Sequence, residues 1–327
     1  MPKILITPRS ITAGGHPSLE RLREAGFELL FCTAGKMPDE KELCTLLPGC
    51  VGHLAGVEPL TAAVLEAATD LKVISRNGVG VDNIDLAAAR ERGIHVCRAE
   101  GANARSVAEL TLGLLLGLAR SIPFSDQCMK AGRWQRRSGV ELAGQTLGLV
   151  GCGQIGRIVA DLALAFGMKV IAFDVAPQTE SLPPRFEHAA LDRVVREADF
   201  LSLHCPAPPD GRPLLAAAEL ALMKPTACLV NTARASLVDS RALCEAIEGG
   251  RLAGAAVDVY EEEPPHDRRL LSLDRVIATP HIGGFTSQGV DRLMEIAVAN
   301  LLECLKSPGL PARVERPGRF AFSPPIA

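Results

Sequence analysis

Short aliphatic runs alternate with amphipathic stretches along most of this 327-residue chain. Such alternation of strand and helix predicts parallel sheets covered by helices on both faces, and continuous apolar runs such as 147–150 are typical of strands buried on both sides. We expect strands at 3–7, 27–31, 51–54, 72–75, 94–96, 146–150, 169–173, 200–203, 228–231, 255–257 and 276–278. The clearest helical patterns span 18–25, 61–68, 103–120, 155–166, 240–248 and 287–306.

The expected strands fall into two groups, before and after the helical region at 103–120. At about 150 residues per domain, the length suggests two domains with substantial cores. The predicted fold class is α/β with two doubly wound parallel-sheet domains: a flavodoxin-like domain over 1–99 and 287–327, and a Rossmann-type domain over 100–286. We expect the helix at 287–306 to return to the first domain, with a cleft between the two. The Pro- and Gly-rich tail at 307–327 is expected to lack regular structure.

The charge balance and the aromatic content argue against a nucleic-acid partner. Lys and Arg number 35 against 38 Asp and Glu, whereas binding to a phosphate backbone usually leaves a basic excess. Trp134 and Tyr260 are the only residues of their types, so platforms for base stacking are not expected.

The ten cysteines are dispersed, and none forms a C-x-x-C pair. This pattern fits free thiols in a reducing cytoplasm better than a disulfide framework or a zinc site. The N-terminal MPKILIT stretch lacks the long apolar region of a signal peptide, and the most apolar segment, 110–119, is shorter than the roughly 20 residues of a membrane span. We therefore expect a cytoplasmic location, no membrane partner and no metal.

The sharpest local motif is a G-x-G-x-x-G turn, which comprises Gly151, Cys152, Gly153, Gln154, Ile155 and Gly156. It lies between an expected strand and an expected helix, where the backbone can approach a pyrophosphate and the helix N-terminus offers free N–H groups. Asp174 ends the next strand, where a carboxylate can bind ribose hydroxyls and repel a 2′-phosphate. The motif predicts a dinucleotide site that prefers NAD to NADP. The alternative is a plain glycine-rich turn with a surface Asp.

Charged residues follow three further strands of the same predicted sheet: Arg234, Glu263 and His281. Singly, each has an ordinary explanation as an arginine paired with Asp239, a member of a solvated acidic run and a turn histidine. Because ligands of open α/β sheets collect at the C-terminal ends of strands, we expect the three to converge. Hydride transfer to a carbonyl needs a proton donor, an anchor for the substrate anion and a carboxylate that orients the donor. His, Arg and Glu supply these three functions.

With these residues in place, the chain resembles the NAD-dependent D-2-hydroxyacid dehydrogenases, and among them the short D-3-phosphoglycerate dehydrogenases, from about residue 3 to 306. The matching motifs, beyond the glycine turn, are RNGVGVDNID at 76–85, GANA at 101–104, VAE at 107–109, HCP at 204–206, NTAR at 231–234, DVYEEEP at 258–264 and PHIGG at 280–284. These matches are specific for the family and much less so for the substrate.

The resemblance implies that His281 is the general acid in carbonyl reduction and the base in the reverse direction. Glu263 would pair with His281 and favour its protonated form, and Arg234 would hold the substrate carboxylate. The implied substrate contacts are Arg76, Asn77, Gly78, Val79, Arg234 and His281. The implied NAD contacts are Val79, Gly151, Gly153, Gln154, Ile155, Gly156, Asp174, His204, Cys205, Pro206, Thr232, Ala233, Arg234, Asp258, His281, Ile282, Gly283 and Gly284. The helices at 103–135, including Trp134, are implied as a homodimer interface.

The chain departs from the family pattern in two places. Ala235 and Ser236 stand where many relatives carry two glycines. Arg76 matches a phosphate-binding arginine of phosphoglycerate enzymes, but a second arginine that some of them carry after the strand at 51–54 is missing.

The predicted activity is therefore hydride transfer between NAD(H) and a small D-2-hydroxy acid. One candidate pair is 3-phosphoglycerate and 3-phosphohydroxypyruvate, and the alternative is reduction of hydroxypyruvate or glyoxylate. Formate or phosphite oxidation is a further option, although Glu263 argues against formate enzymes, which resemble this scaffold but pair the histidine with glutamine. A less favoured alternative is a dinucleotide-sensing protein resembling the C-terminal-binding corepressors.

Overall fold

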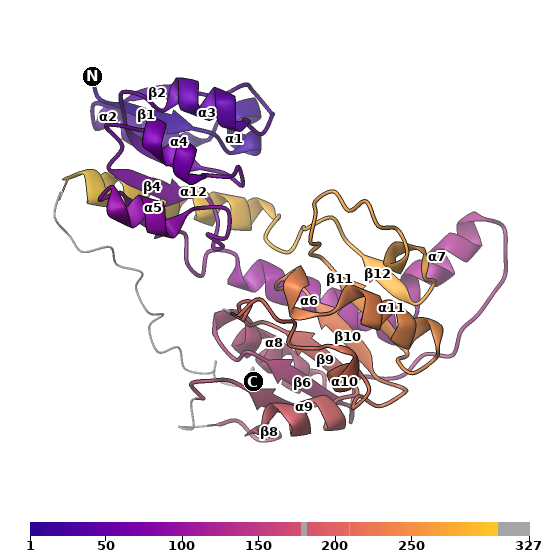
Figure 1. The fold of residues 1–327 in the computed structure, drawn as a ribbon. Helices are drawn as coiled ribbons and strands as arrows, with labels where there is room; N and C mark the ends of the chain where they lie inside the picture. The colour runs from indigo at the N-terminus through magenta and orange to yellow at the C-terminus, as the bar shows by residue number, and fades with distance from the viewer. Residues whose placement is uncertain (178–181, 209, 307–327) are drawn as a thin grey trace. The chain divides into compact units, whose positions relative to one another are not determined.

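The computed structural model describes residues 1–177, 182–208 and 210–306, so the tail expected at 307–327 lies outside the described residues. The chain divides into two compact units: Met1–Asn103 together with helix α12 (Ser287–Lys306), and Ala104–Thr286. Each unit holds one parallel sheet with helices on both faces (Figure 1). The predicted fold class, α/β with two parallel-sheet domains, is confirmed.

The first unit contains a five-stranded sheet with the strand order β2-β1-β3-β4-β5. Its strands are β1 (Lys3–Ile6), β2 (Glu28–Phe31), β3 (Cys50–Ala55), β4 (Val73–Arg76) and β5 (His95–Arg98). Its other helices are α1 (Arg9–Gly14), η1 (Pro17–Leu19), α2 (Glu20–Glu24), α3 (Glu40–Leu46), α4 (Ala62–Ala67) and α5 (Leu86–Glu91). The chain leaves β1 toward one edge of the sheet and returns through β3 toward the other. The C-terminal ends of β1 and β3 therefore form the switch point at which open α/β sheets bind ligands.

Helix α12 covers one face of this first sheet. Met294, Ala297, Val298 and Leu301 are fully buried and recur at the three- and four-residue spacing of one helical stripe. They pack with Ile4 and other apolar residues of the sheet, while helices α3 and α4 cover the opposite face. This last helix of the described chain thus belongs to the core of the first unit.

The second unit contains a seven-stranded parallel sheet with the order β12-β11-β10-β9-β6-β7-β8. Its strands are β6 (Thr146–Val150), β7 (Lys169–Phe173), β8 (Phe186–His188), β9 (Phe200–Leu203), β10 (Cys228–Asn231), β11 (Gly254–Val257) and β12 (Val276–Ala278). Its helices are α6 (Ala104–Ala119), α7 (Ile122–Lys130), α8 (Gln154–Ala165), α9 (Leu191–Glu197), α10 (Ala217–Leu220), η2 (Ala235–Leu237), α11 (Ser240–Glu248) and η3 (Leu270–Ser272). The direction of winding reverses between β6 and β9, so the ends of these two strands form the switch point of this sheet.

The apolar sequence of the strands explains why both faces of the second sheet are covered. Leu147 and Leu149 face a layer that includes α6 and α8, whereas Leu201 and Leu229 face a layer that includes α9 and α11. Among the described residues, no single helix is long and apolar enough to cross a bilayer. Helices α6 and α7 meet that criterion only together, and the chain bends by 65° between them.

All strands expected from the sequence are present, most of them within one residue of the expected bounds. Strand β8 was not expected, because three residues at the edge of a sheet are too few to show a period. The helix expected at 18–25 is divided into η1 and α2. The short helices α1, α3, α5, α9 and α10 were not expected either, because fewer than two helical turns carry little periodic signal.

Candidate active site

The glycine turn occupies the switch point of the second sheet, directly after β6. Gly151 has a φ of +93°, a conformation that side chains disfavour, and a Cβ there would lie 2.6 Å from the carbonyl oxygen of His204. A Cβ at Gly156 would collide with the Gly151 carbonyl oxygen. These two glycines therefore let β6, α8 and the chain after β9 approach one another closely.

The middle of the turn is open and rich in N–H donors. A Cβ at Gly153 would meet nothing within 4 Å, and Gly153 caps the N-terminus of α8 without any side-chain hydrogen bond. Uncapped N–H groups at a helix N-terminus attract phosphate. Sequence reasoning missed Arg157, whose Nε donates to the Cys152 carbonyl at 3.1 Å and whose Nη1 is buried without a partner. The signal for it was a basic residue directly after the last glycine of the motif.

Asp174 lies beside the glycine turn. Its Oδ2 accepts a hydrogen bond from the Cys152 N–H at 2.7 Å, and its Oδ1 accepts one from the Ala176 N–H at 2.9 Å. The carboxylate is thus fixed at the end of β7, next to the turn, and it remains partly exposed. Burial raises the pKa of the Cys152 thiol to about 12 and that of the Cys205 thiol to about 11, so both thiols stay neutral.

The HCP motif follows β9 on the other side of the turn. The His204 N–H donates to the Val150 carbonyl at 2.7 Å, which holds this segment, including Cys205 and Pro206, against the end of β6. The His204 Nε2 lies 2.9 Å from the Ser202 hydroxyl, while its Nδ1 is buried without a partner. Burial lowers the pKa of His204 from the ordinary 6.5 to about 3, because the charged ring would be poorly solvated.

The lowered pKa of His204 predicts acid sensitivity of the second unit. Between pH 6.5 and about 3 the unfolded chain binds a proton at His204 that the folded protein does not bind, so stability falls as the pH falls through this window. We expect His204→Gln to remove about 1.4 kcal/mol per pH unit from the slope of unfolding free energy against pH. Urea unfolding without cofactor measures this slope. The exposed His266 provides the control His266→Gln, and equal slopes in both variants would contradict the prediction.

Arg234 follows β10 in a turn that Asn231 braces. Asn231 is 2% exposed. Its side chain donates a hydrogen bond to the Arg234 carbonyl at 2.8 Å and accepts one from the Ala233 N–H at 3.1 Å. The Thr232 hydroxyl lies 3.1 Å from that of Thr111 on α6. These hydrogen bonds fix the backbone of residues 231–234, so the Arg234 side chain extends from a well-defined backbone position.

Glu263 and His281 lie in direct contact. The Nδ1 of His281 is 2.8 Å from Oε1 and 2.9 Å from Oε2 of Glu263, and both side chains are well exposed. Since the carboxylate engages Nδ1, the other ring nitrogen, Nε2, is left to face a ligand. Arg234, Glu263 and His281 follow β10, β11 and β12, which are adjacent parallel strands, so all three belong to one edge of the sheet.

Asp258 holds the backbone on which His281 is mounted. His281 has a φ of +52°, in the left-handed region that non-glycine residues rarely adopt. Asp258 is 1% exposed, and its two carboxylate oxygens accept hydrogen bonds from the Thr279 hydroxyl and from the N–H groups of Ile282 and Gly283 at 2.6 to 2.8 Å. The Tyr260 hydroxyl adds a bond to the Thr279 carbonyl at 2.8 Å. Sequence reasoning missed Thr279 and Tyr260, whose roles depend on contacts between two strand ends.

The remaining predicted residues belong to the first unit: Arg76 is the last residue of β4, and the others lie in the loop that follows it. The Asn77 N–H donates to the Ala55 carbonyl at 2.8 Å, and the Arg76 guanidinium donates to the Asn77 carbonyl and lies against Gly78. Val79 is part of the same loop, which continues to α5.

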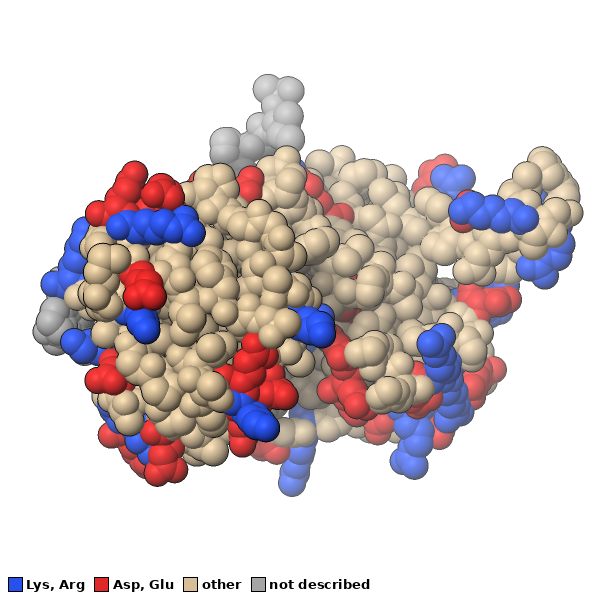
Figure 2. All heavy atoms as spheres, turned by 90° about the horizontal axis from the view of Figure 1, so that it is seen from above, with Lys and Arg blue, Asp and Glu red and all other residues tan. Residues whose placement is uncertain are grey.

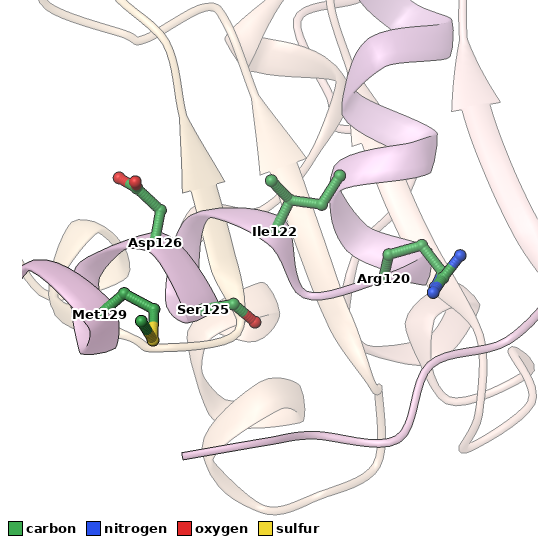
Figure 3. A pocket seen from close by; sticks show the side chains of 5 residues that line it. All are labelled: Arg120, Ile122, Ser125, Asp126 and Met129. Carbon is green, nitrogen blue, oxygen red and sulfur yellow. The ribbon is translucent and has the colours of Figure 1, made fainter. Parts of the chain in front are cut away.

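Two surface hollows of the second unit lie away from these residues. One of about 460 Å³ is formed by Arg120, Ile122, Ser125, Asp126 and Met129, where α6 gives way to α7 (Figure 3). A second, of about 600 Å³, is lined by residues that include Phe200, Cys228 and Gly254, at the starts of β9, β10 and β11. Because the predicted site residues follow the ends of parallel strands, this second cavity lies at the opposite edge of the sheet.

Charged side chains of both signs lie beside one another on the face shown in Figure 2. Among the ion pairs of the second unit, Arg193 contacts Glu187 and Glu197. Within 1–177, 182–208 and 210–306, no group of three or more His, Cys, Asp or Glu residues could hold a metal ion. All ten cysteines are free thiols.

Comparison with known proteins places these features in a family. The family model described as "D-isomer specific 2-hydroxyacid dehydrogenase, NAD binding domain" matches residues 112–283. The chain is 46% identical over 261 residues to hydroxypyruvate reductase of Thermotoga maritima, which covers 78% of this chain and 85% of that protein. It is 47% identical over 234 residues to D-3-phosphoglycerate dehydrogenase of Methanocaldococcus jannaschii, but this match spans only 44% of that longer protein and 70% of this chain. The crystal structure of the TT0316 protein of Thermus thermophilus superposes with a TM-score of 0.85 at 40% identity, covering 93% of this chain and 97% of that one.

Proposed function

The chain belongs to the D-isomer-specific 2-hydroxyacid dehydrogenase family, and we propose that His281, Glu263 and Arg234 carry its hydride-transfer reaction between NAD(H) and a small 2-hydroxy or 2-keto acid. The observation that carries this proposal is the contact of 2.8 Å between His281 Nδ1 and Glu263, which leaves Nε2 of the histidine for the substrate. A histidine oriented by a carboxylate is suited to give and take a proton.

The residues around the glycine turn fit a nicotinamide dinucleotide. The open position at Gly153 and the uncapped N-terminus of α8 suit a pyrophosphate, and the Asp174 carboxylate at the end of β7 suits ribose hydroxyls. The carboxylate would repel a 2′-phosphate, which supports a preference for NAD over NADP. When bound, the nicotinamide ring supplies or accepts the hydride.

The protein's own groups handle the proton and the substrate charge. His281 Nε2 donates its proton to the carbonyl oxygen as negative charge develops there, and Glu263 stabilises the imidazolium from the Nδ1 side. The Arg234 guanidinium holds the substrate carboxylate in two parallel hydrogen bonds and polarises the carbonyl. The 77–80 loop of the first unit would offer backbone N–H groups to a substrate carboxylate. In the reverse direction, His281 removes the hydroxyl proton.

For the substrate, two residues of the first unit favour different candidates. Arg76 supports a phosphorylated acid such as 3-phosphohydroxypyruvate. Glu58, in the loop after β3, supports hydroxypyruvate or glyoxylate, because hydrogen bonds to His53 and Thr7 outweigh burial and hold its pKa below the usual value. An ionised carboxylate in this loop disfavours a phosphate dianion nearby. We favour the unphosphorylated acids, for which a matching activity is named in the Thermotoga relative.

A panel assay tests this function. NADH oxidation is followed with hydroxypyruvate, glyoxylate and 3-phosphohydroxypyruvate, and again with NADPH in place of NADH. We expect turnover of the first two, slower turnover of the third and weaker use of NADPH. Faster turnover of the phosphorylated acid would show that Arg76, and not Glu58, determines the choice of substrate. Tight NADH binding without any turnover would instead support a dinucleotide-sensing protein.

We also propose that the described chain forms a homodimer through the segment that includes α7. Ile122, Met129 and Trp134 are 53%, 58% and 80% exposed, and Ile122 and Met129 line the same surface hollow. Adjacent exposed apolar side chains mark interaction surfaces. In Figure 3, Ile122 and Met129 both project from this segment. We expect sedimentation at the mass of a dimer, and at the monomer mass for Met129→Glu/Trp134→Glu. The control Val175→Glu changes another exposed apolar residue, and a monomeric wild type would overturn the proposal.

We propose that the two domains expected from the sequence divide the ligands. Residues 1–99 and 287–327 would bind the acid, and residues 100–286 would bind the dinucleotide. The free thiols support a location in the reducing cytoplasm.

A further inference from the structure

A buried polar cluster occupies the switch point of the first sheet. Thr7 follows β1, His53 lies on β3, and Glu58 belongs to the loop after β3. The three residues are at most 1% exposed. In the sequence, this loop stood out only for lacking an arginine.

The carboxylate of Glu58 is the centre of the cluster. Its Oε1 accepts hydrogen bonds from the Thr7 hydroxyl and from the Gly56 N–H at 2.9 Å, and lies 3.3 Å from Nε2 of His53. The Thr7 hydroxyl also lies 3.0 Å from His53 Nε2. Glu58 therefore folds back onto its own loop and ties it to both strands of the switch point.

The space around Gly56 fits this arrangement and no larger residue. A Cβ at Gly56 would lie 2.6 Å from Glu58 Oε2 and 3.2 Å from the Cα of Pro8. The chain at 55–58 is thus packed tightly around the carboxylate.

Hydrogen bonds also join the chain at 55–60 to the segment 77–85. The Asn77 N–H donates to the Ala55 carbonyl at 2.8 Å, and Asn83 Nδ2 donates to the Glu58 carbonyl at 2.7 Å. Leu60 closes the connection, since its N–H donates to the Asn83 carbonyl at 2.8 Å and its carbonyl accepts from the Asp85 N–H at 2.9 Å. The position of residues 77–85 therefore depends on the position of the Glu58 loop.

We infer that Glu58, supported by Thr7 and His53, is a positioning residue that sets the backbone of the 77–80 loop for binding the substrate carboxylate. The inference rests on the proposed function, because that loop is assigned there to the substrate. A buried polar cluster around a carboxylate often contributes little net stability. The hydrogen bonds from this cluster to one loop are therefore better explained by placement of that loop.

The test compares Glu58→Gln with wild type in the full chain. Gln keeps the size and one acceptor oxygen but loses the charge. We expect the KM for hydroxypyruvate to rise about 10- to 100-fold, because a small displacement of a binding loop can weaken binding by this factor. The kcat and the KM for NADH should change much less. Thr7→Val should act in the same direction, and the double variant should cost less than the sum of the two because they share one network.

The matched control is Glu42→Gln. Glu42 also lies in the first unit and accepts hydrogen bonds from a backbone N–H and a threonine hydroxyl, both of Thr33 at 2.8 Å, but it is only partly buried. A cluster that only stabilises the fold would lower the melting temperature in Glu58→Gln without moving the KM for the acid, and this result would overturn the inference.

Amide hydrogen exchange measures how readily the loop opens, and it does not depend on turnover. Amide exchange in peptides that span 77–85 should become at least about tenfold faster in Glu58→Gln and stay unchanged in Glu42→Gln. Unchanged exchange in Glu58→Gln would overturn the positioning role. If the wild type reduces no 2-keto acid, the proposed function fails, while the exchange measurement still decides whether Glu58 positions the loop.

Discussion

His281→Asn is expected to lower the turnover of hydroxypyruvate by about 10²- to 10⁴-fold, the usual contribution of general acid–base catalysis. Asparagine is chosen because it tolerates the left-handed backbone at φ +52° about as well as histidine does, whereas most other residues would add strain. The amide cannot donate a proton with the required acidity. The KM for NADH should change little, since Asp258 still holds the backbone of Ile282 and Gly283.

The control for His281 is His266→Asn. His266 lies in the same unit, and its Nε2 is 3.3 Å from a carboxylate oxygen of Glu262, so it forms a second histidine–glutamate pair that includes neither His281 nor Glu263. Glu263→Gln should give an intermediate loss, because the imidazolium then lacks its counter-charge. Wild-type turnover of every 2-keto acid by His281→Asn would show that another group donates the proton.

The fold was predictable because its strands and long helices carry strong local patterns. The bounds of β6, β7, β9, β10, α11 and α12 agree with those expected from the sequence. Strands buried on both faces are continuous apolar runs that end at glycine or at a polar residue, so the transition is abrupt. The edge strand β8 and the short helices lack such runs. For α5 a local signal was present, since Asp85 accepts hydrogen bonds from the N–H groups of Ala87 and Ala88 as an N-cap.

For the candidate site, sequence reasoning reached the strand ends but not the contacts that support them. Residues such as Arg234 and His281 could be named because parallel strands end at one edge of the sheet. The role of Asp258 could not be seen, because it depends on how the chain turns after β12 and on the positive φ of His281. The Glu58 cluster was equally hidden, since it joins residues about 50 positions apart whose side chains each look ordinary. Long-range hydrogen bonds of this kind have no period along the chain.

The structure suggests a division between groups that touch ligands and groups that hold them. His281 is exposed, whereas Asp258 and Glu58, which accept hydrogen bonds from loop N–H groups, are 1% exposed. Carboxylates are suited to this task because each oxygen accepts several hydrogen bonds at once. The histidine that transfers the proton is thus mounted on a backbone segment that a buried carboxylate holds in place.

Arg234→Met is expected to lower kcat/KM for hydroxypyruvate by about 10²- to 10³-fold, because loss of one partner of a desolvated charge pair costs roughly 2–5 kcal/mol. The substitution keeps an unbranched apolar stem, so the turn braced by Asn231 should persist. Arg234→Lys should recover only part of the loss, because an ammonium cannot make the two parallel hydrogen bonds of a guanidinium. The control is Arg241→Met, which removes an exposed arginine from α11.

The carboxylate contact itself can be tested with the substrate rather than the enzyme. Wild type should prefer hydroxypyruvate to its methyl ester, which lacks the negative charge, by a factor of the same order as the loss in Arg234→Met. In Arg234→Met this preference should nearly disappear, because the group that distinguishes acid from ester is gone. A variant that is slower but keeps the full preference would assign carboxylate binding to the 77–80 loop and leave Arg234 with polarisation of the carbonyl alone.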